Sequence, residues 1–443
     1  MKVLNVGGGA REHSIVEALS KSGAEIYSVM KNKNPGIAKA SKDYVLMDEC
    51  EIEKVAEWAI SKGVELAIIG PESPLGEGIV DLLESKGIPC VGPSKAAAQI
   101  EISKEYARDL MKRNNIPGYV EHRAFDNLED IRQFLEEFGR DVVVKPIGLT
   151  GGKGVKIMGE QLKDYDDVLA YCSEILENEI GGQSRLIIEE RCIGEEFTLQ
   201  AFCDGKTLAP MPAVQDHKRA YEGDEGPNTG GMGSYSESNW LLPFLTKEEY
   251  DQAVDIMKQT IEAMAAEGTP YKGVLYGQFM LTADGLKLIE YNARFGDPES
   301  MNVLPTLQDD FLTICKGIVD GNLSAAITFD PKATVCKYVV PIGYGVKSLV
   351  GEKIYLDEGA IKKTGAELYY ASVNEEGGQI YTTSSRSLGI VGVANTISEA
   401  EFISEEALRY ISGKAYMRHD IGKPESIRRK IERMEEIRGS RSA

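Results

Sequence analysis

The first 103 residues alternate between short apolar runs and helical patterns, and this alternation restricts the folds open to that part of the chain. The apolar runs have the length of buried strands and lie at residues 2–6, 25–30, 43–47, 65–69 and 89–91. Helical patterns separate them, at residues 11–22, 51–62 and 77–86. Strands separated by helices in this way predict a doubly wound parallel sheet. Because ligands of such sheets bind at the carboxyl ends of the strands, we expect a ligand at that edge.

The rest of the chain has a mixed pattern, so we expect an α/β and α+β multidomain protein. After a helix at 103–115, the predicted elements are strands at 142–146, 155–158, 185–190 and 196–203, a helix at 162–177, a polar glycine-rich loop at 215–236, a helix at 246–266, paired strands at 273–282 and 286–292, and then several strands with one helix at 398–411. The predicted domains are an N-terminal α/β domain at 1–103, a central domain at 104–331 with a flap subdomain at about 120–193, and a small C-terminal α+β domain at 332–443.

Composition narrows the class of partner. The formal net charge of −20 argues against nucleic acid, because proteins that bind it present a basic surface. No apolar run approaches the roughly 20 residues of a membrane span, and the N-terminus lacks a secretory signal, so we expect a cytoplasmic protein with small-molecule partners. The seven cysteines include no CxxC pair and are expected to be reduced thiols. The expected assembly is a monomer or a weak homodimer.

The stretch VVVKPIGLTGGKGVKI (142–157) has the composition of a phosphate-binding segment. It is not a Walker loop, because Gly154 follows Lys153 where a hydroxyl residue is needed and the next residues alternate like a strand. We interpret it as a glycine-rich hairpin that forms a flap. Lys145 ends a buried-looking strand, where a lysine needs an anionic partner. Together with Lys153 it would hold the phosphates of a nucleotide.

The glycines at 7–9 follow the first predicted strand but do not match a dinucleotide fingerprint. Glu12 occupies the third glycine position, and the second strand ends in residues 31–34, KNKN, where NAD binding favours an acidic residue. A helix N-terminus beside Arg11 suits a phosphate. We therefore favour a phosphorylated sugar at this site over NAD, with a purely structural turn as the remaining alternative.

Glu290 and Asn292 are two residues apart on a predicted strand, so their side chains share one face. Oxygen ligands in this arrangement suit Mg²⁺. The length of the preceding turn determines which residue lies opposite Glu290 and could be a third ligand. A three-residue loop places Gln278 there, whereas a two-residue Asp-Gly turn places Phe279 there. The alternative to a metal site is that Glu290 pairs with Arg294 or a lysine on a solvated face.

Four blocks carry a resemblance to a known family over essentially the full chain: GGGAREHS, GPESPL, QDHKRAYEGDEGPNTGGMG and EYNARFGDPES. The chain resembles the phosphoribosylamine–glycine ligases of the ATP-grasp superfamily. This implies an ATP-grasp core with a glycine-rich flap, between the N-terminal sheet and the C-terminal domain. It also implies a reaction of purine biosynthesis in which ATP and Mg²⁺ or Mn²⁺ convert glycine to glycyl phosphate, which 5-phosphoribosylamine then attacks.

The resemblance also implies roles for individual residues. The residues expected to contact ATP are Lys104, Lys145, Lys153 and Gly154 at the phosphates, and Glu189, Glu190 and Glu196 around the adenosine. The expected metal ligands are Glu290 and Asn292, with Gln278 as a third. The sugar phosphate is assigned to Gly9, Arg11, Asn34, Gly36 and Glu72. The residues expected to close on glycine and phosphoribosylamine are Asp216, His217, Lys218, Arg219 and Asn228, with Arg294 beside the transferred phosphoryl group. Of these, Asp216, Lys218 and Arg294 are the expected catalytic residues.

The flap departs from the family pattern, because Pro146 and Ile147 replace an alanine and an aspartate. Pro146 removes a backbone donor, and the missing aspartate could have held a flap lysine.

Three other functions can be distinguished from the ligase that the resemblance implies. Another ATP-grasp ligase or carboxylase would not share the 215–233 block. A nucleotide-binding protein without turnover would release no phosphate, and a dehydrogenase would bind NADH.

Overall fold

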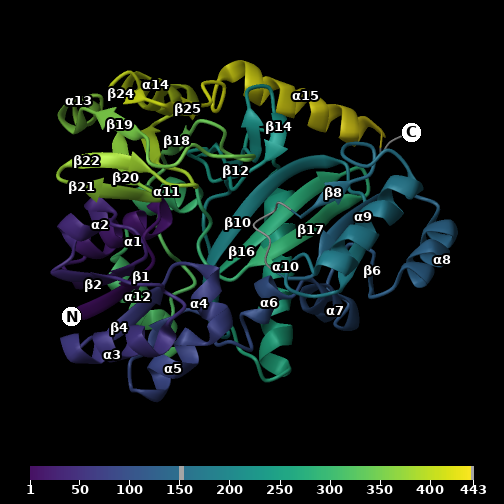
Figure 1. The fold of residues 1–443 in the computed structure, drawn as a ribbon, viewed down its shortest axis with the longest axis horizontal. Coiled ribbons are helices and arrows are strands. Elements are labelled where there is room, and N and C mark those ends of the chain that lie inside the picture. Colours follow the sequence, from purple (N-terminus) through teal and green to yellow (C-terminus); the bar gives the residue numbers. More distant parts are fainter. Residues whose placement is uncertain (149–153, 441–443) are drawn as a thin grey trace.

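The computed structural model describes residues 1–148 and 154–440, and its N-terminal part is a five-stranded parallel sheet (Figure 1). The strand order is β3-β2-β1-β4-β5. The strands are β1 (Lys2–Val6), β2 (Glu25–Met30), β3 (Asp43–Leu46), β4 (Leu66–Ile69) and β5 (Cys90–Val91). The intervening helices are α1 (Ala10–Lys21), α2 (Pro35–Ala40), α3 (Ile52–Lys62), α4 (Glu72–Glu77) and α5 (Ile79–Ser85). The doubly wound sheet expected from the sequence is confirmed. Its order reverses between β1 and β4, where such sheets bind ligands.

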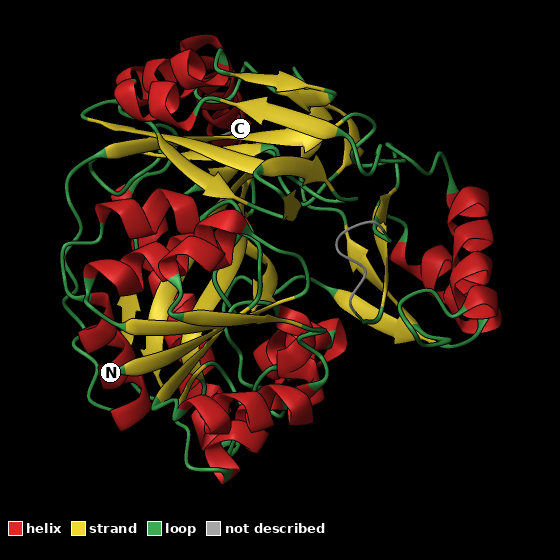
Figure 2. Ribbon diagram, turned by 60° about the vertical axis from the view of Figure 1, so that its left-hand side comes forward, coloured by secondary structure: helices red, strands yellow, loops and turns green. Residues whose placement is uncertain are grey.

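The central part contains two four-stranded sheets, with orders β6-β9-β7-β8 and β11-β10-β16-β17. The first consists of β6 (His122–Phe125), β7 (Val142–Pro146), β8 (Lys156–Ile157) and β9 (Leu186–Glu190), and α8 (Leu128–Phe138) and α9 (Tyr165–Asn178) pack on it. The second consists of β10 (Gly194–Asp204), β11 (Leu208–Pro210), β16 (Lys272–Thr282) and β17 (Gly285–Asn292). Figure 2 shows the first sheet standing apart from the body of the molecule, with its helices on the outer side. Strands β7 and β8 pair antiparallel, as the predicted hairpin requires.

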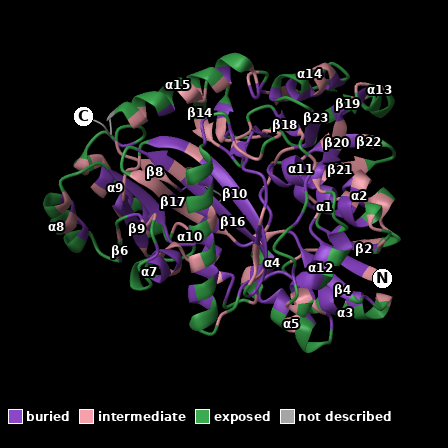
Figure 3. Ribbon diagram, turned by 180° about the vertical axis from the view of Figure 1, so that it is seen from behind, coloured by how far each residue is buried: buried purple, intermediate pink, exposed green. Residues whose placement is uncertain are grey.

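Helices connect and cover these sheets. They are α6 (Gln99–Ile102), α7 (Lys104–Arg113), α10 (Lys247–Ala266), α11 (Ser300–Val303), a 3₁₀ turn at Leu304–Thr306, and α12 (Phe311–Asp320). Ser103 caps α7, because its hydroxyl accepts a hydrogen bond from the Tyr106 N–H at 3.2 Å. Figure 3 shows that β10 and β16 are buried along most of their length, while α8, α10 and the C-terminal helix α15 (Pro424–Ser440) expose their outer faces.

The segment 215–236 is not the irregular loop expected from the sequence. It forms four short strands, β12 (Gln215–Asp216), β13 (Arg219–Tyr221), β14 (Glu225–Asn228) and β15 (Gly233–Ser236). Strand β15 pairs with β18 (Ala333–Pro341), and β12 pairs with β15, so both belong to a sheet of the C-terminal part. The prediction was wrong because these strands are only two to four residues long and contain many glycines, which hides the alternation that marks a strand. The segment therefore links the central and C-terminal parts.

The C-terminal part has two sheets. Besides β12 and β15, they contain β18 (Ala333–Pro341), β19 (Lys353–Leu356), β20 (Glu367–Tyr370), β21 (Val373–Glu376), β22 (Gln379–Thr382), β23 (Leu388–Ala394), β24 (Ile411–Gly413) and β25 (Ala415–Met417). The prediction of a single helix was wrong, because α13 (Glu358–Lys363) and α15 (Pro424–Ser440) accompany α14 (Ile397–Leu408). Within the described ranges, no helix combines the length and apolar composition that a membrane crossing needs.

Candidate active site

One face of the β10/β16/β17 sheet brings Gln278 and Glu290 together. The hairpin turn has two residues, Ala283 and Asp284, with Thr282 opposite Gly285, so neither turn considered from the sequence is correct. An irregularity between Gln278 and Phe279 shifts the register by one residue and places Gln278 opposite Glu290. The extra residue is Ile289, a β-bulge that no turn-counting argument from sequence could include.

Lys218 extends from the segment after β12 into this face. Its ammonium lies 2.6 Å from Gln278 Oε1, 3.8 Å from a Glu196 carboxylate oxygen and 4.0 Å from a Glu290 carboxylate oxygen. Burial lowers the pKa of Lys218, but Glu196 and Glu290 outweigh this effect and raise it. Burial likewise raises the pKa of Glu290, while Lys218, Lys145 and Lys104 hold it below its ordinary value. The site therefore attracts a cation through carboxylate and amide oxygens.

The predicted metal ligands fit a hard divalent cation. Gln278, Glu290 and Asn292 offer only oxygen as ligand atoms, which Mg²⁺ prefers, and the first two do so where the Lys218 ammonium approaches. Asn292 Oδ1 also accepts a hydrogen bond from Arg294 at 3.3 Å. In the part of the chain that the structure describes, no three His, Cys, Asp or Glu side chains form a metal-binding group. The predicted metal ligands are not such a group, because two of them, Gln278 and Asn292, are amides and only Glu290 is a carboxylate.

Two lysines line the same region from the opposite side. The Lys145 ammonium, at the end of β7, lies 2.6 Å from Glu189, and the Lys104 ammonium donates to the Gly148 carbonyl at 2.9 Å. Burial lowers the pKa of Lys104, and Lys145 adds to this effect against the opposing charge of Glu290. The Gly154 carbonyl accepts a hydrogen bond from Tyr171. Lys153 lies outside the described residues.

Glu189 and Glu190 are adjacent on β9, so their side chains lie on opposite faces of the strand. Both oxygens of Glu189 contact buried cations, and although burial raises its pKa, Arg108 and Lys145 lower that pKa to about 2. Glu190 instead pairs with Lys287 at 2.8 Å. That both carboxylates frame the adenosine stays a prediction, and in this structure Glu189 holds Lys145.

At the N-terminal sheet, Arg11 and Gly9 are engaged by Glu12. The Gly9 N–H donates to one Glu12 oxygen at 2.7 Å, and Arg11 Nε donates to the other at 2.6 Å. Arg11 also donates to the Phe295 carbonyl at 3.3 Å. Glu12 was considered from the sequence only as a residue that breaks the dinucleotide pattern. In the structure it orients the first turn of α1 toward the 294–299 segment.

Arg294 connects the N-terminal sheet to the predicted metal ligands. Its guanidinium lies 3.3 Å from Glu72 and 3.0 Å from Glu101, and it also contacts Asn292. Burial raises the pKa of Glu72, but Arg294 and Arg11 lower it to about 2. In Glu101, burial prevails over Arg294 and the pKa rises to about 7. Glu101 was not recognised from the sequence, because an isolated glutamate in a helical pattern carries no signal.

Asn34 and Gly36 have structural roles that the sequence did not reveal. The Asn34 side chain caps α2 and donates to the carbonyls of Gly8 and Tyr370, at 3.0 and 2.7 Å, so its polar atoms are already used. A Cβ on Gly36 would lie 2.0 Å from the His13 ring. Asn34 joins the N- and C-terminal parts, and Gly36 makes room for His13. Their assignment to the sugar phosphate stays a prediction.

The residues of the 215–233 block divide between two environments. Asp216 lies beside Gly231, where burial and the neighbouring Glu299 raise its pKa well above the ordinary value. His217 is buried against Tyr235, and burial lowers its pKa to about 4. The charges that act most on His217 are Asp224, Arg418 and Lys430. That His217 closes on the substrates together with Asp216 and Lys218 stays a prediction.

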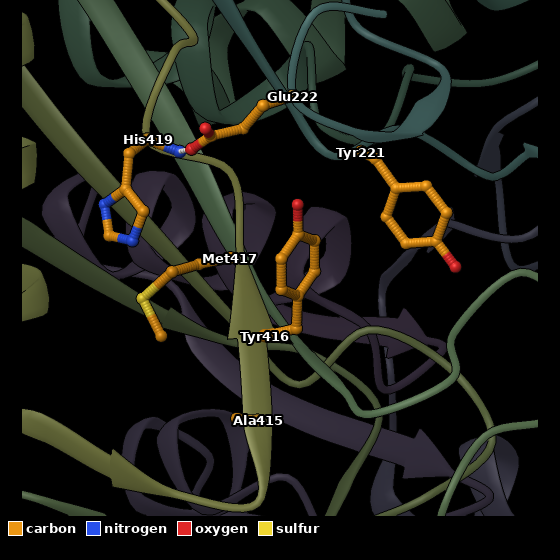
Figure 4. A pocket seen from close by; sticks show the side chains of 6 residues that line it. All are labelled: Tyr221, Glu222, Ala415, Tyr416, Met417 and His419. Atoms are coloured by element: carbon orange, nitrogen blue, oxygen red, sulfur yellow. Dashed lines mark hydrogen bonds between the residues drawn. The ribbon is translucent and has the colours of Figure 1, made fainter. Parts of the chain in front are cut away.

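Arg219 and Asn228 pair across the β13–β14 hairpin. Arg219 also forms an ion pair with Glu160 from the flap subdomain and donates to the Gly226 carbonyl at 3.0 Å. The hairpin therefore reaches the first central sheet. A shallow pocket of about 460 Å³ lies at its other side, lined by Tyr221, Glu222, Ala415, Tyr416, Met417 and His419 (Figure 4). None of the predicted site residues lines this pocket.

Arg386 is a site-adjacent residue that the sequence did not indicate. It follows β22 in the C-terminal part and lies over the Tyr338 ring. Its guanidinium donates to the Asp297 carbonyl at 2.8 Å, pairs with the Asp297 carboxylate at 2.9 Å and contacts the Gly230 carbonyl. Arg386 thereby ties the 228–233 segment to the 294–299 segment. Nothing in the sequence indicated this role, because the partners Asp297 and Gly230 lie 89 and 156 positions before Arg386.

Two antiparallel sheets, with Lys145 on one and the side-chain oxygens of Gln278, Glu290 and Asn292 on the other, are the arrangement of an ATP-grasp protein. Family models agree over most of the chain. The N domain, the ATP-grasp (A) domain and the C domain of phosphoribosylglycinamide synthetase match residues 1–101, 102–300 and 334–424. The chain belongs to the phosphoribosylglycinamide synthetase family.

Curated relatives and solved structures agree with this assignment. The chain is 54% identical to phosphoribosylamine–glycine ligase of Methanobrevibacter smithii, over 99% of this chain and 100% of the relative, and 52% identical to that of Pyrococcus horikoshii, over 99% and 98%. The crystal structure of phosphoribosylamine–glycine ligase from Thermotoga maritima is 25% identical, with a TM-score of 0.81 over 95% of this chain and 100% of that one. A biotin carboxylase domain from Hydrogenobacter thermophilus, 17% identical with a TM-score of 0.74 over 98% and 93%, shares the fold.

Proposed function

We propose that this protein joins glycine to 5-phospho-D-ribosylamine at the expense of ATP, giving N1-(5-phospho-D-ribosyl)glycinamide, ADP and phosphate, a step of de novo purine biosynthesis. Membership of the family and the names of its relatives support the activity. The observation that carries it is the position of Arg294, whose guanidinium contacts Asn292 on the metal side and Glu72 at the carboxyl edge of the N-terminal sheet. A group transferred past Arg294 would move between the nucleotide side and the sugar side.

In the first step, a carboxylate oxygen of glycine attacks the γ-phosphorus of ATP. The bond between that phosphorus and the β,γ-bridging oxygen breaks, which gives glycyl phosphate and ADP. Such a step depends on positioning and charge neutralisation rather than on a protein nucleophile. Lys104 and Lys145 would hold the phosphates on one side, with Lys153 and Gly154 from the flap. Arg294 would orient the glycine carboxylate beside the transferred phosphoryl group.

In the second step, the amine of phosphoribosylamine attacks the acyl carbon, phosphate leaves with the bonding electrons, and the nitrogen gives up a proton. We assign proton acceptance to Asp216. A buried carboxylate whose pKa is raised by burial and by Glu299 accepts a proton more readily than an ordinary aspartate. Lys218 lies near the same carboxylate and would stabilise the negative charge on the acyl oxygen. Gly9, Arg11 and Glu72 would then face the sugar phosphate and its hydroxyls.

Gln278, Glu290 and Asn292 would hold Mg²⁺ or Mn²⁺. A divalent cation at this position supplies neutralisation of phosphate charge. Glu196 lies beside Gln278 and would face the ribose of ATP. We also propose that the enzyme acts in the cytoplasm as a monomer or a weak homodimer, which sedimentation velocity at several protein concentrations would test.

The test is ADP release from purified protein with ATP, Mg²⁺, glycine and freshly made phosphoribosylamine, each omitted in turn. We expect ADP formation to require both glycine and the sugar amine, and mass spectrometry to detect the amide. ADP formation that ignores glycine but responds to another carboxylate would replace the substrate and keep the ATP-grasp chemistry. A folded protein that binds ATP and releases no ADP under any combination would contradict the proposal.

A further inference from the structure

Arg108 lies in α7, outside every motif recognised in the sequence, and is 97% buried, with 3% of its surface exposed. A guanidinium can be buried at this depth only when its N–H groups find acceptors. Four hydrogen bonds from Arg108 satisfy this requirement, two to a carboxylate and two to backbone carbonyls. The two pairs of acceptors belong to different sheets.

The carboxylate belongs to Glu189 of β9. Arg108 Nε and Nη2 donate to its two oxygens at 2.7 and 3.2 Å, in the bidentate geometry that fixes both partners. One of these oxygens also lies 2.6 Å from the Lys145 ammonium, at the end of β7. Glu189 is therefore held between two cations. Arg108 fixes the carboxylate, and the carboxylate fixes the ammonium that faces the ATP phosphates in the proposed reaction.

The carbonyls belong to Leu288 and Ile289 of β17. Arg108 Nη1 donates to the first at 2.7 Å and Nη2 to the second at 2.6 Å. Ile289 is the extra residue of the bulge that shifts β17 against β16. Because β17 is the edge strand of its sheet, these carbonyls have no neighbouring strand to supply a partner and need another donor. Arg108 supplies it, and the bulge in turn sets Glu290 opposite Gln278.

We propose that Arg108 is a positioning residue for the nucleotide half of the site. One guanidinium fixes both the ammonium of Lys145 and the bulge that brings Glu290 to Gln278, so the phosphate-binding side and the metal-binding side keep a set separation. The inference rests on the proposed function for the identity of the ligand, ATP with a divalent cation. Arg108 acts through Glu189 and the β17 backbone, and the glycine side of the site depends on other residues.

The test compares Arg108→Lys with Arg113→Lys. Arg113 is on the same helix and forms the same bidentate pair with Glu267, but both side chains are largely exposed. The readouts are thermal unfolding, the dissociation constant of Mn²⁺–ATP by calorimetry, and the KM values for ATP and glycine. We expect Arg108→Lys to weaken Mn²⁺–ATP binding and raise the KM for ATP by about tenfold or more, as for residues that orient metal ligands. The KM for glycine should not change, and Arg113→Lys should behave as the wild type.

Wild-type affinity for Mn²⁺–ATP in Arg108→Lys would overturn the inference, as would an equal rise in the KM for glycine, which indicates general loosening. If the lysine variant does not fold, Glu189→Gln releases Lys145 while leaving the carbonyl contacts, and wild-type affinity in that variant overturns the inference as well. Calorimetry separates this inference from the proposed function: a wild type that binds Mn²⁺–ATP and makes no amide would refute only the latter.

Discussion

At the residue scale, the same amino acid has different roles that burial and partners decide. Glu189 and Glu290 both belong to the nucleotide side, yet the first is saturated by Arg108 and Lys145 while the second has only distant ammonium groups around it. The sequence identified both as site residues because acids in these motifs are conspicuous. It could not separate their roles, since the distinguishing partners come from other elements.

Glu290→Ala should lower turnover far more than stability. The substitution removes the single carboxylate among the predicted metal ligands, and we expect turnover to fall by about 100-fold, the upper range for losses around a metal site. Steady-state ADP release at saturating Mg²⁺ measures the effect, with Glu262→Ala on the exposed face of α10 as the control. Activity of Glu290→Ala equal to that of the control would exclude the metal assignment.

Glu189→Gln should destabilise the protein in a pH-dependent way. Removing one partner from a buried ion pair costs about 3 kcal/mol in the free energy of unfolding. The folded-state pKa of about 2 lies below the ordinary value of 4.5, so the stabilisation is present above pH 4.5 and is lost as pH falls towards 2. Urea unfolding at pH 7 and pH 3 should show a difference between wild type and variant that narrows at pH 3. A difference that is constant with pH would contradict the ion pair.

At the scale of helices and strands, hydrophobic periodicity predicted the long elements and missed the short ones. The N-terminal strands, α7, α10 and the β16–β17 pair lie within a few residues of their predicted positions. The strands of 215–236 were not predicted because two to four residues cannot display a period, and because β18, the partner of β15, lies about 100 residues downstream. The bulge in β17 escaped for a related reason: it is stabilised by Arg108 from another element.

Gly231→Ala should impair turnover through Asp216. Gly231 has φ of +107°, and a Cβ there would lie 2.6 Å from the Asp216 carboxylate and 2.8 Å from Pro298. Displacing a reacting group by about 1 Å can cost on the order of 100-fold in rate. Gly223→Ala is the matched control, since φ is +77° and the nearest atom is 4.0 Å away. We expect the two variants to lose similar thermal stability, and only Gly231→Ala to lose turnover. Equal turnover in the two variants would contradict the steric argument.

At the scale of the whole molecule, the site is assembled from three parts of the chain. Periodicity predicted the N-terminal sheet and the central core, and the motifs and the family resemblance supplied the residues proposed for its nucleotide side. They did not predict that the C-terminal part contributes Arg386, or that α15 returns to the central sheet, where Lys430 lies 3.3 Å from Glu195 and 3.1 Å from Asp224. Such contacts depend on how separately stable parts pack, and one sequence carries no local pattern for them.

Substituting Lys430 and Arg433 together with methionine should release α15 from the core. Glu195 is buried, and these two residues are the cations within 4.0 Å of it in the described structure. Leaving its charge uncompensated should cost about 3 kcal/mol. Thermal unfolding measures the loss, and Arg428→Met on the exposed side of α15 should leave the transition unchanged. An unchanged transition in the double variant would show that packing alone holds the helix.

The contact between Lys218 and Gln278 has a thermodynamic consequence. An ammonium 2.6 Å from Gln278 Oε1 and a divalent cation on the same oxygen would repel each other at short range, so the two compete. Lys218 belongs to a segment built into the C-terminal sheet, whereas Gln278 belongs to the central sheet. Cation binding must therefore release Lys218 towards the substrates. By reciprocity, any substrate that draws Lys218 away must tighten the cation by the same free energy, which a titration of Mn²⁺ with and without glycine would measure.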